Sequence, residues 1–452
     1  MNKYYRISGK VVFPEGLAAG EGRGSNVIDI ARNGEGKPVL RGTSIAGALR
    51  SALAEWGVPQ KSISYWFGEK LEGKNDFNAS QILVADVVLD SGSQQPESRT
   101  FNMLNRHTGA VLDNALFGVE SLPPKTSGNL LIYVIPRDAQ PAENILRAIE
   151  NVFDSSLILG GNRNRGIGRM DASGVKCIAL DCSTVDGFSK WQDIRYADRA
   201  GTPVDLTGCE EVAFGDPSVL PVKNYEVEFK IPRGEDISIG FGKNLDGDLC
   251  AQQYAYSAKG NKLWRIPGST FRGAFRSWMT HLAVLENQNV LYQEKNPKAD
   301  LIGWAGKEGD ERKKAQENPA LLNDPILDLF GSLYKRGRIH FTDAYCDESD
   351  KINEQKRAHV AVDRFSGGAV PGALFFNKVL VGDAVFRLKI SLLPHSAQEL
   401  VWLKKTLLAI HLGVISVGSS KASGLLEIAN WDNLKLQMEN DIKEFDVRKA
   451  EV

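Results

Sequence analysis

Basic side chains stand beside glycine turns at several places in this sequence, and that combination could bind phosphate. Glycine lets backbone amides approach an anion closely, and arginine or lysine neutralises its charge. The clearest case is LGGNRNRGIGR at 159–169, and a weaker one is VGSSKASGL at 417–425. A glycine-rich strand connection with incidental charge is the alternative interpretation. The phosphate-binding residues predicted from these two loops are Gly160, Arg163, Arg165, Gly166, Arg169, Gly418, Lys421 and Gly424.

A second group of arginines follows glycine turns at two predicted helix starts. The stretches LRGTSIAGALRSALAEW (40–56) and IPGSTFRGAFRSWMTHL (266–282) each place apolar residues at helical spacing after the turn. The opposite face carries Arg50 in the first stretch, and Arg272 and Arg276 one turn apart in the second. Free amides and the helix dipole favour an anion at such a start. For either stretch alone, an amphipathic surface helix with solvated arginines explains the pattern equally well.

These motifs belong to a unit that the sequence contains twice. Residues 42–51 match residues 268–277 at five of ten positions with a constant offset of 226. Such self-similarity indicates a duplicated module. In each copy an alternating, strand-like segment, at 4–12 and 225–231, precedes a glycine-rich loop and then the helix. The duplication favours phosphate binding, because both copies keep basic residues beside the same turns.

A predicted hairpin also repeats in the second half of each copy. The segments NRHTGAVLDNALF (105–117) and DRFSGGAVPGALF (363–375) place an arginine before a glycine turn and a returning apolar strand. Arg106 and Arg364 are therefore predicted at the basic tips of two hairpins. The offset of 258 between the hairpins, continued without a gap, pairs the two glycine loops with each other. It sets Gly160, Arg163 and Gly166 against Gly418, Lys421 and Gly424.

The repeat predicts two domains. We place the first at 1–209 and the second at 210–452. The end of the first, from about 186, has no regular period and is interpreted as a linker. The second carries a polar insertion with glycine and proline at about 283–325, predicted to be a surface excursion. The linker is expected to be packed, because three residues in it need cover: Trp191, Ile194 and Tyr196.

Composition limits the class of protein. With 452 residues, 42% hydrophobic and 25% charged, the chain is typical of soluble globular proteins and unlike disordered or membrane chains. The N-terminus lacks a signal-peptide core, so a cytoplasmic location is expected. Five scattered cysteines and six unpaired histidines indicate neither a disulfide framework nor a metal site. A net charge of −1 argues against a global basic field, so a polyanion would be held by specific loops.

Taken together, the duplicated elements resemble the RAMP superfamily, the repeat-associated proteins of CRISPR effector complexes. The shared order is strand, glycine loop, IPGSTFRGAFR helix, aspartate strand (Asp86, Asp343), arginine hairpin and glycine-basic loop. The resemblance covers nearly the whole chain, twice. The first copy departs from the family pattern, with Arg41 in place of proline and Ala46 in place of a basic residue. Two such units in one chain look most like the tandem backbone subunit of a type III-D effector.

The resemblance implies an α+β fold with two tandem RAMP domains. Each would have a ferredoxin-like core related to RNA-recognition motifs, with a thumb-like hairpin and loop insertions. It implies a subunit that holds a guide RNA and inserts its thumbs into the guide–target duplex. The partners would be guide RNA, target RNA, other backbone RAMP subunits and a large signalling subunit, with no membrane.

Many type III backbone subunits cut target RNA with an aspartate in the glycine-rich loop before the helix. Carried over by position, the resemblance implies Asp29 in the first copy, and Asp246 or Asp248 in the second. It also implies a divalent metal ion, expected to be Mg²⁺, and no organic cofactor. RNA supplies its own nucleophile, the 2′-hydroxyl, so a positioned carboxylate with a metal ion suffices. A solvated aspartate that favours a turn is the alternative for each residue.

Three functions therefore compete. The first is an endoribonuclease subunit, and the second is a structural subunit that binds guide RNA with inert aspartates. The third, a small-molecule enzyme with a duplicated domain, lacks any cofactor motif: neither GxGxxG after a strand nor GxxxxGK[ST] occurs.

Overall fold

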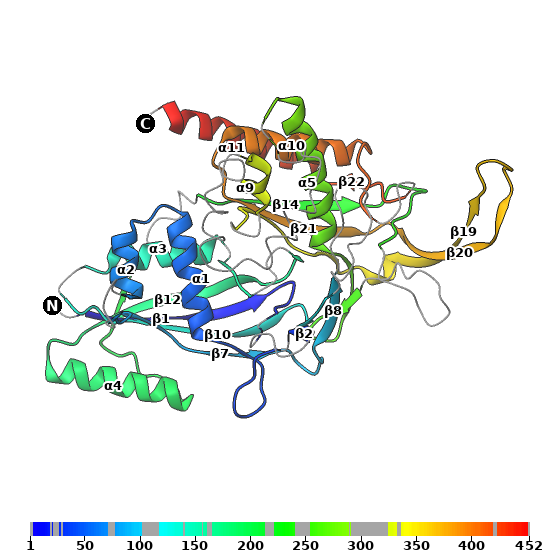
Figure 1. The fold of residues 1–452 in the computed structure, drawn as a ribbon. Coiled ribbons are helices and arrows are strands. Elements are labelled where there is room, and N and C mark those ends of the chain that lie inside the picture. Colours follow the sequence, from blue (N-terminus) through cyan, green and yellow to red (C-terminus); the bar gives the residue numbers. More distant parts are fainter. Residues whose placement is uncertain are drawn as a thin grey trace. The chain divides into compact units, whose positions relative to one another are not determined.

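A computed structural model describes residues 3–18, 20, 27–28, 30–70, 77–101, 117–138, 141–155, 157–160, 165–212, 221–239, 254–288, 290, 324–331, 336–418 and 423–450 (Figure 1). The chain divides into two compact units, which we describe separately. Unit 1 comprises Met1–Arg163, Ile167–Pro221 and Tyr256–Asn261. Unit 2 comprises Asn164–Gly166, Val222–Ala255 and Lys262–Val452.

Unit 1 is built on an antiparallel sheet in the order β11, β12, β1, β10, β7, β3. β6 pairs with β10, and β13 pairs with β12. The strand bounds are β1 (Lys3–Phe13), β3 (Val39–Leu40), β6 (Ile82–Val84), β7 (Val87–Asp90), β10 (Thr126–Val134), β11 (Leu157–Ile158), β12 (Arg169–Asp181) and β13 (Glu210–Val212).

Helices cover both faces of this sheet (Figure 1). α1 (Gly42–Glu55), α2 (Gln60–Phe67) and α3 (Glu143–Asp154) bury their apolar stripes against one face. α4 (Val185–Ala200) packs on the other face. The alternation of β1 explains the two layers, because Tyr5 and Ile7 join the first core and Tyr4 joins the second.

α4 corrects the interpretation of this region as an irregular linker. Thr184 caps the helix by accepting a hydrogen bond from the amide of Gly187 at 3.1 Å. Trp191 and Ile194 are buried as expected, but Tyr196 is 75% exposed, so the expectation that it needs cover was wrong. The helix escaped the sequence pattern because only these two apolar positions face the sheet.

Unit 2 also combines an antiparallel sheet with helices, which here gather in one core. Its antiparallel sheet runs β15, β16, β18, β21, β14, β22, with β17 beside β21. α5 (Gly268–Leu285), α9 (Pro325–Phe330), α10 (Ala397–His411) and α11 (Trp431–Ala450) share one core with the sheet. The strand bounds are β14 (Lys223–Lys230), β15 (Tyr254–Tyr256), β16 (Lys262–Ile266), β17 (Ile339–Phe341), β18 (Ala344–Cys346), β21 (Val385–Leu392) and β22 (Glu427–Ile428).

Both units have the ferredoxin-like order. Along the chain, the main elements of each unit follow the order strand, helix, strand, strand, helix, strand. Across the sheet, these four strands lie side by side in the order fourth, first, third, second. In unit 1 these are β12, β1, β10 and β7, and in unit 2 they are β22, β14, β21 and β18. The predicted α+β class with two tandem ferredoxin-like domains is confirmed.

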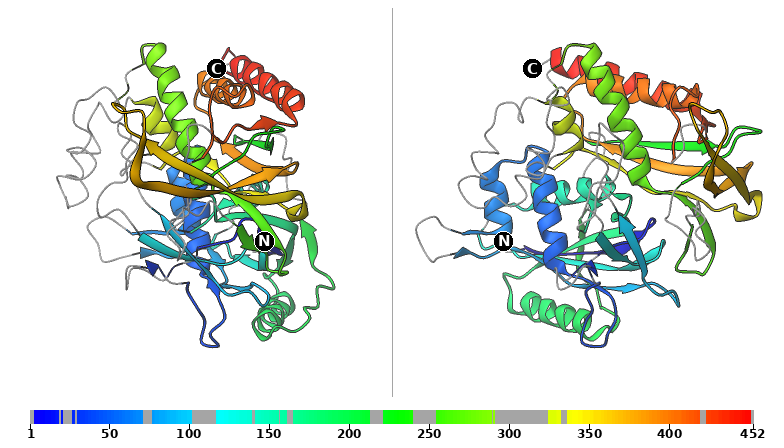
Figure 2. Two further views of the ribbon diagram at one scale, coloured as in Figure 1. Left: turned by 90° about the vertical axis from the view of Figure 1, so that its right-hand side faces the viewer. Right: turned by 45° about the vertical axis from the view of Figure 1, so that its right-hand side comes forward.

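A hairpin stands between the second and third strands of each unit. In unit 2, β19 (Ile352–Val362) and β20 (Ala369–Gly382) form a long two-stranded arm, gold in Figures 1 and 2. In unit 1, β8 (Glu97–Phe101) and β9 (Phe117–Ser121) pair in the same place, and β2 (Val27–Ile28) lies along β9. A smaller pair, β4 (Glu69–Lys70) and β5 (Phe77–Asn78), follows α2.

One edge of the second sheet is closed by side chains. β22 pairs only with the end of β14, at Phe229 and Lys230. Beyond it, Asn430 accepts from the amide of Glu228 at 3.1 Å and donates to the carbonyl of Glu226 at 2.9 Å. Gln437 of α11 donates to the carbonyl of Asn224 at 3.0 Å. Side-chain amides thus take the hydrogen bonds that a neighbouring strand would make.

Most of the predicted insertion at about 283–325 lies outside the described residues, and at its near end α5 continues to Leu285. At its far end Asp324 caps α9 by accepting from the amides of Ile326 and Leu327. Among the helices described here, none combines the length and apolar character needed to cross a bilayer.

Candidate nucleic-acid interface

An aspartate directly before the second strand holds the start of the glycine-turn helix in both units. The Oδ1 of Asp86 accepts a hydrogen bond from the amide of Gly42 at 2.7 Å. The Oδ1 of Asp343 accepts one from the amide of Gly268 at 2.8 Å. Since a carboxylate of the protein occupies this amide in each unit, an incoming phosphate has one donor fewer than the sequence pattern indicated.

The glycines at these helix starts are required by close packing. A Cβ at Gly42 would lie 2.0 Å from the carbonyl oxygen of Val84, and one at Gly268 would lie 2.6 Å from that of Thr342. Any side chain would push the aspartate strand away from the helix. Both turns therefore serve the joint between helix and strand.

The loop that leaves the first strand of unit 1 meets two other segments. Leu17 pairs with Leu122, directly after β9, and the amide of Leu122 donates to the carbonyl of Leu17 at 2.8 Å. The amide of Gly168 donates to the carbonyl of Gly16 at 2.9 Å. The strand-exit loop, the hairpin root and the terminal glycine loop are thus joined at residues 16–18.

Unit 2 has the same junction at residues 236–238. Ile237 and Leu380 of β20 exchange both backbone hydrogen bonds, at 3.0 and 2.9 Å. The amide of Gly424 donates to the carbonyl of Asp236 at 2.8 Å. Three segments far apart in sequence therefore converge in each half of the chain, and we name this arrangement the loop junction.

The loop junction corrects the pairing of the two glycine loops. Gly160 and Gly418 are equivalent, because a Cβ on them would lie 2.4 Å and 2.5 Å from the carbonyl oxygens of Ala18 and Ser238. The equivalent of Gly424 is Gly168, since both have φ near 94° and a Cβ on each would lie 2.1 Å from a carbonyl, of Leu159 or Val417. The first loop is therefore two residues longer, and the ungapped alignment was wrong.

Gly166 has another role. It is grouped with unit 2, forms a parallel bridge with Thr342, and its carbonyl accepts from the amide of Asp343 at 2.8 Å. Its φ is 91°, and a Cβ would lie 1.9 Å from the Oδ1 of Asp343. Glycine is needed here for packing against the backbone. Its neighbour Arg165 is half-buried.

Arg169 is buried within unit 1. Its Nε lies 3.4 Å from the carboxylate of Glu15, which is also buried, and its Nη1 lies 2.8 Å from that of Asp171. The two carboxylates, one buried and one partly exposed, neutralise this guanidinium. The described geometry gives Arg169 a role in anchoring β12, and its predicted contact with RNA stays a prediction.

The arginines of the glycine-turn helices are partly withdrawn from solvent. Arg272 donates to the carbonyl of Phe330, and its guanidinium lies 5.4 Å above that residue's ring. This contact ties α5 to α9. Arg276 and Arg50 are half-buried on α5 and α1. Of the three, Arg272 has a clear structural contact, and all three stay predicted phosphate contacts.

The tip of the β19–β20 hairpin is ordered by Asp363. Its Oδ1 accepts from the amides of Ser366 at 2.7 Å and Phe365 at 3.0 Å. These hydrogen bonds, from Ser366 first, hold the pKa of Asp363 below its usual value. Arg364 is exposed, and Phe365 is fully exposed. The predicted basic tip thus also presents an aromatic ring, which sequence reasoning had not singled out.

Several predicted residues lie outside the described part of the chain. Within the described residues, no group of three or more His, Cys, Asp or Glu side chains could hold a metal ion. The metal-dependent step therefore stays a prediction that rests on the undescribed aspartates. The predicted residues that lie outside the described part of the chain are Asp29, Arg106, Arg163, Asp246, Asp248 and Lys421.

The thiols are consistent with structural roles. Burial raises the pKa of Cys177 to about 12 and that of Cys346 to about 11. Both side chains are fully buried. Neither would form a thiolate near neutral pH, so neither is suited to nucleophilic chemistry.

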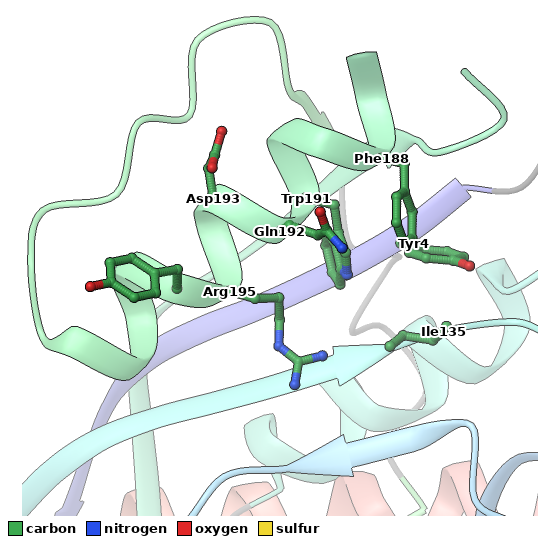
Figure 3. Close-up of a pocket in the computed structure, with 8 residues that line it drawn as sticks. Tyr4, Ile135, Phe188, Trp191, Gln192, Asp193 and Arg195 are labelled. Atoms are coloured by element: carbon green, nitrogen blue, oxygen red, sulfur yellow. The ribbon is translucent and has the colours of Figure 1, made fainter. Parts of the chain in front are cut away.

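A shallow hollow beside α4 has a packing explanation (Figure 3). The ring of Trp191 meets those of Tyr4 and Tyr133 edge to face, with centroids 5.4 and 5.6 Å away. The guanidinium of Arg195 lies 4.2 Å above the ring of Tyr133. These contacts seat α4 on the sheet, and the hollow contains neither a glycine turn nor a cluster of cations.

Comparison with known proteins supports the duplicated arrangement. A family model described as the RAMP superfamily matches the chain in two stretches, residues 9–171 and 254–425. The first stretch runs from β1 into β12, and the second runs from β15 through the terminal glycine loop. No curated protein matches the chain. Each match includes one glycine-turn helix, one aspartate strand and one hairpin.

Proposed function

Since the chain belongs to the RAMP superfamily and is therefore a CRISPR-associated RNA-binding subunit, we propose that it is the backbone subunit of a type III effector. In this proposal it holds a guide RNA and cleaves complementary target RNA, and two units in one chain suggest the III-D kind. Its partners would be guide RNA, target RNA, other backbone RAMP subunits and a large signalling subunit. Base pairing would read the target sequence, and the protein would grip backbone and shape.

The observation that carries this proposal is the loop junction, present in both units. It joins the loop that leads to the candidate aspartates, the root of the hairpin and the glycine-basic loop. These are the three segments whose sequences indicate contact with RNA. A subunit that must hold a phosphate backbone and present a target nucleotide needs such segments on one rigid base.

The hairpin of unit 2 supports the same function. Phe365 is fully exposed beside Arg364, and Val362 and Leu374 are also exposed along the arm. An aromatic ring held in water at an ordered tip has no role in the fold. It can stack on a base or wedge between bases, while the arginine neutralises phosphate.

The chemistry proposed for each half is transesterification by the 2′-hydroxyl of the target. That hydroxyl attacks the adjacent phosphorus, the P–O5′ bond breaks, and the 5′-oxygen takes up a proton. Asp29 would assist in the first half, and Asp246 or Asp248 in the second, by accepting the hydroxyl proton. A divalent metal ion, for which we propose Mg²⁺, would supply charge stabilisation at the phosphate.

A structural role without cleavage is the second candidate, and one observation favours it. The turns at Asn33–Lys37 and Ser257–Asn261 close the same hydrogen bond at 2.9 Å, which fixes an offset of 224. Counted back from these turns, Asp29 falls on Gln253, which is not acidic. The two halves therefore do not place an acid at the same distance from this turn, which favours an inert loop in one of them.

Cleavage by the assembled complex separates these candidates. Asp29→Ala should remove one of two cuts, and the pair Asp246→Ala/Asp248→Ala should remove the other. Asp432→Ala is a matched control, because Asp432 is an exposed aspartate in the first turn of α11. Mapped product ends and retained target RNA are the readouts. If a variant that carries all three substitutions still makes both cuts unchanged, catalysis by these aspartates is overturned.

A further inference from the structure

Asp236 lies at the centre of the loop junction in unit 2. Its backbone carbonyl accepts from the amide of Gly424 at 2.8 Å. Its side-chain Oδ2 lies 3.0 Å from the Nη2 of Arg357 on β19. The next residue, Ile237, makes the backbone pair with Leu380 on β20. One short segment thus contacts the glycine-basic loop and both strands of the hairpin.

The ion pair attaches the hairpin at a second point. Leu380 stands opposite Glu354 in the hairpin register, and Arg357 lies three residues farther along β19. At the rise of a strand, this places the second attachment about 10 Å farther out. A single backbone pair would let the arm pivot. The ion pair, about 10 Å farther along the arm, opposes that rotation.

The carboxylate depends on this arginine for its charge balance. The side chain of Asp236 is 16% exposed, against 46% for Arg357. Its other oxygen, Oδ1, is buried and has no hydrogen-bond partner within the described residues. Removing the guanidinium would leave a largely buried charge uncompensated.

The equivalent position of the first unit has no such pair. The contacts of the loop junction make Gly16 the equivalent of Asp236, because both carbonyls accept from the terminal glycine loop. A Cβ on Gly16 would lie 2.3 Å from the carbonyl oxygen of Leu122, so that position excludes a side chain. The ion pair of Asp236 therefore has no counterpart at the equivalent position of unit 1.

We propose that Asp236 is a positioning residue that fixes, through Arg357, the angle between the β19–β20 hairpin and the loop leading to Asp246 and Asp248. Its effect on cleavage rests on the proposed function, whereas its effect on the hairpin does not. The hairpin holds the target against the loop, and so the pair sets how precisely the second half aligns the scissile phosphate.

Hydrogen exchange on the full chain without RNA tests the attachment. Asp236→Ala should speed exchange of the Leu380 amide about fivefold, the size expected for one such ion pair. Arg357→Ala should speed it at least as much, because it also leaves the carboxylate of Asp236 uncompensated. The double variant should be no faster than either single one, because both remove the same contact. Glu354→Gln is the control, since it breaks only the Glu354–Lys378 pair within the hairpin. Unchanged exchange in Asp236→Ala would overturn the proposal.

Cleavage by the assembled complex tests the consequence. Asp236→Ala should slow the cut assigned to Asp246 and Asp248 several-fold, leave the Asp29 cut unchanged, and leave guide retention unchanged. Arg357→Ala should slow the second cut in the same way. Arg357→Lys should leave that cut close to the rate of the unaltered complex, because lysine can also pair with the carboxylate of Asp236. Equal loss of both cuts would contradict positioning. If the unaltered complex makes no cut, the proposed cleavage fails, and the exchange experiment alone decides the role of Asp236.

Discussion

Asp343 binds the first amide of α5 through Gly268 at 2.8 Å, and its side chain is almost completely buried. In unit 1, Asp86 makes the same contact with Gly42 at 2.7 Å, but its side chain is 45% exposed and pairs with Arg41 at 3.0 Å. The same joint between strand and helix is therefore made in two environments. Because Asp343 is buried, its hydrogen bond to the helix is expected to contribute more to stability than that of Asp86.

This difference predicts unequal effects on stability. Asp343→Ala should lower the free energy of unfolding by about 2 kcal/mol, and Asp86→Ala by about 1 kcal/mol, the range for lost helix caps. Urea denaturation followed by circular dichroism measures both. A larger loss for Asp86→Ala would contradict the assignment of the buried cap to Asp343.

The helix glycines should divide into two classes. Gly42→Ala and Gly268→Ala should destabilise by several kcal/mol, because their Cβ atoms would meet backbone carbonyls within 2.6 Å. Gly47→Ala and Gly273→Ala are matched controls on the same helices, with nothing within 4 Å of the added Cβ. They should stabilise by about 0.5–1 kcal/mol, since alanine favours helix. Thermal unfolding midpoints would show opposite signs for the two pairs.

Two buried phenols predict a loss of stability at high pH. Burial, with the hydrogen bond to Asp198, raises the pKa of Tyr133, and burial near Asp441 raises that of Tyr225. Above about pH 10 the unfolded chain loses protons that the folded chain keeps, so stability falls as pH rises. Tyr225→Phe should flatten the fall of the thermal midpoint between pH 9 and 11. Tyr196→Phe, at an exposed position, should leave it unchanged.

Part of this arrangement follows directly from sequence patterns. Phe271, Phe275 and Met279 stand at helical spacing, and all three are fully buried on α5. The roles of the arginines could not be predicted in this way. Arg169 meets Glu15 across 154 positions of sequence, and Arg272 meets Phe330 across 58. Only the folded chain brings such partners together. From sequence alone, a basic residue beside a glycine is therefore compatible both with phosphate binding and with an internal structural contact.

The glycine loops show the same limit more finely. Gly166 and Gly168 both have positive φ, and each satisfies a pattern of spaced glycines. Their difference lies in whether Asp343 or Leu159 is opposite, which no spacing encodes. The candidate aspartates were found through the resemblance to a family, because a lone loop aspartate has no pattern of its own.

Guide binding should depend on salt through the loop arginines. Arg163→Ala/Arg165→Ala should weaken guide retention and reduce the slope of log affinity against log salt by roughly 0.7 for each lost contact. Lys190→Ala/Arg199→Ala on α4 removes the same charge elsewhere in the first half and serves as the control. Filter binding at several salt concentrations gives both slopes. An unchanged slope would remove Arg163 and Arg165 from the interface.

The exposed ring at the hairpin tip should matter for target RNA and not for the fold. Phe365→Ala should leave the free energy of unfolding within about 0.5 kcal/mol of that of the unaltered protein, because the side chain is fully exposed. Lost stacking should weaken target binding by about 1–3 kcal/mol. Phe365→Trp should preserve binding. Equal target affinity for the alanine and tryptophan variants would exclude stacking.

The side-chain amides along β14 have a consequence for how copies of this protein behave at high concentration. A bare strand edge invites another chain to add to the sheet, which is a common route to aggregation. Asn430 and Gln437 already donate to the carbonyls of Glu226 and Asn224, so an incoming strand would first have to displace these two side-chain amides. This edge of the sheet therefore resists the addition of a strand from another chain. Association with other proteins is then expected to use surfaces where side chains, and not backbone hydrogen bonds, make the contacts.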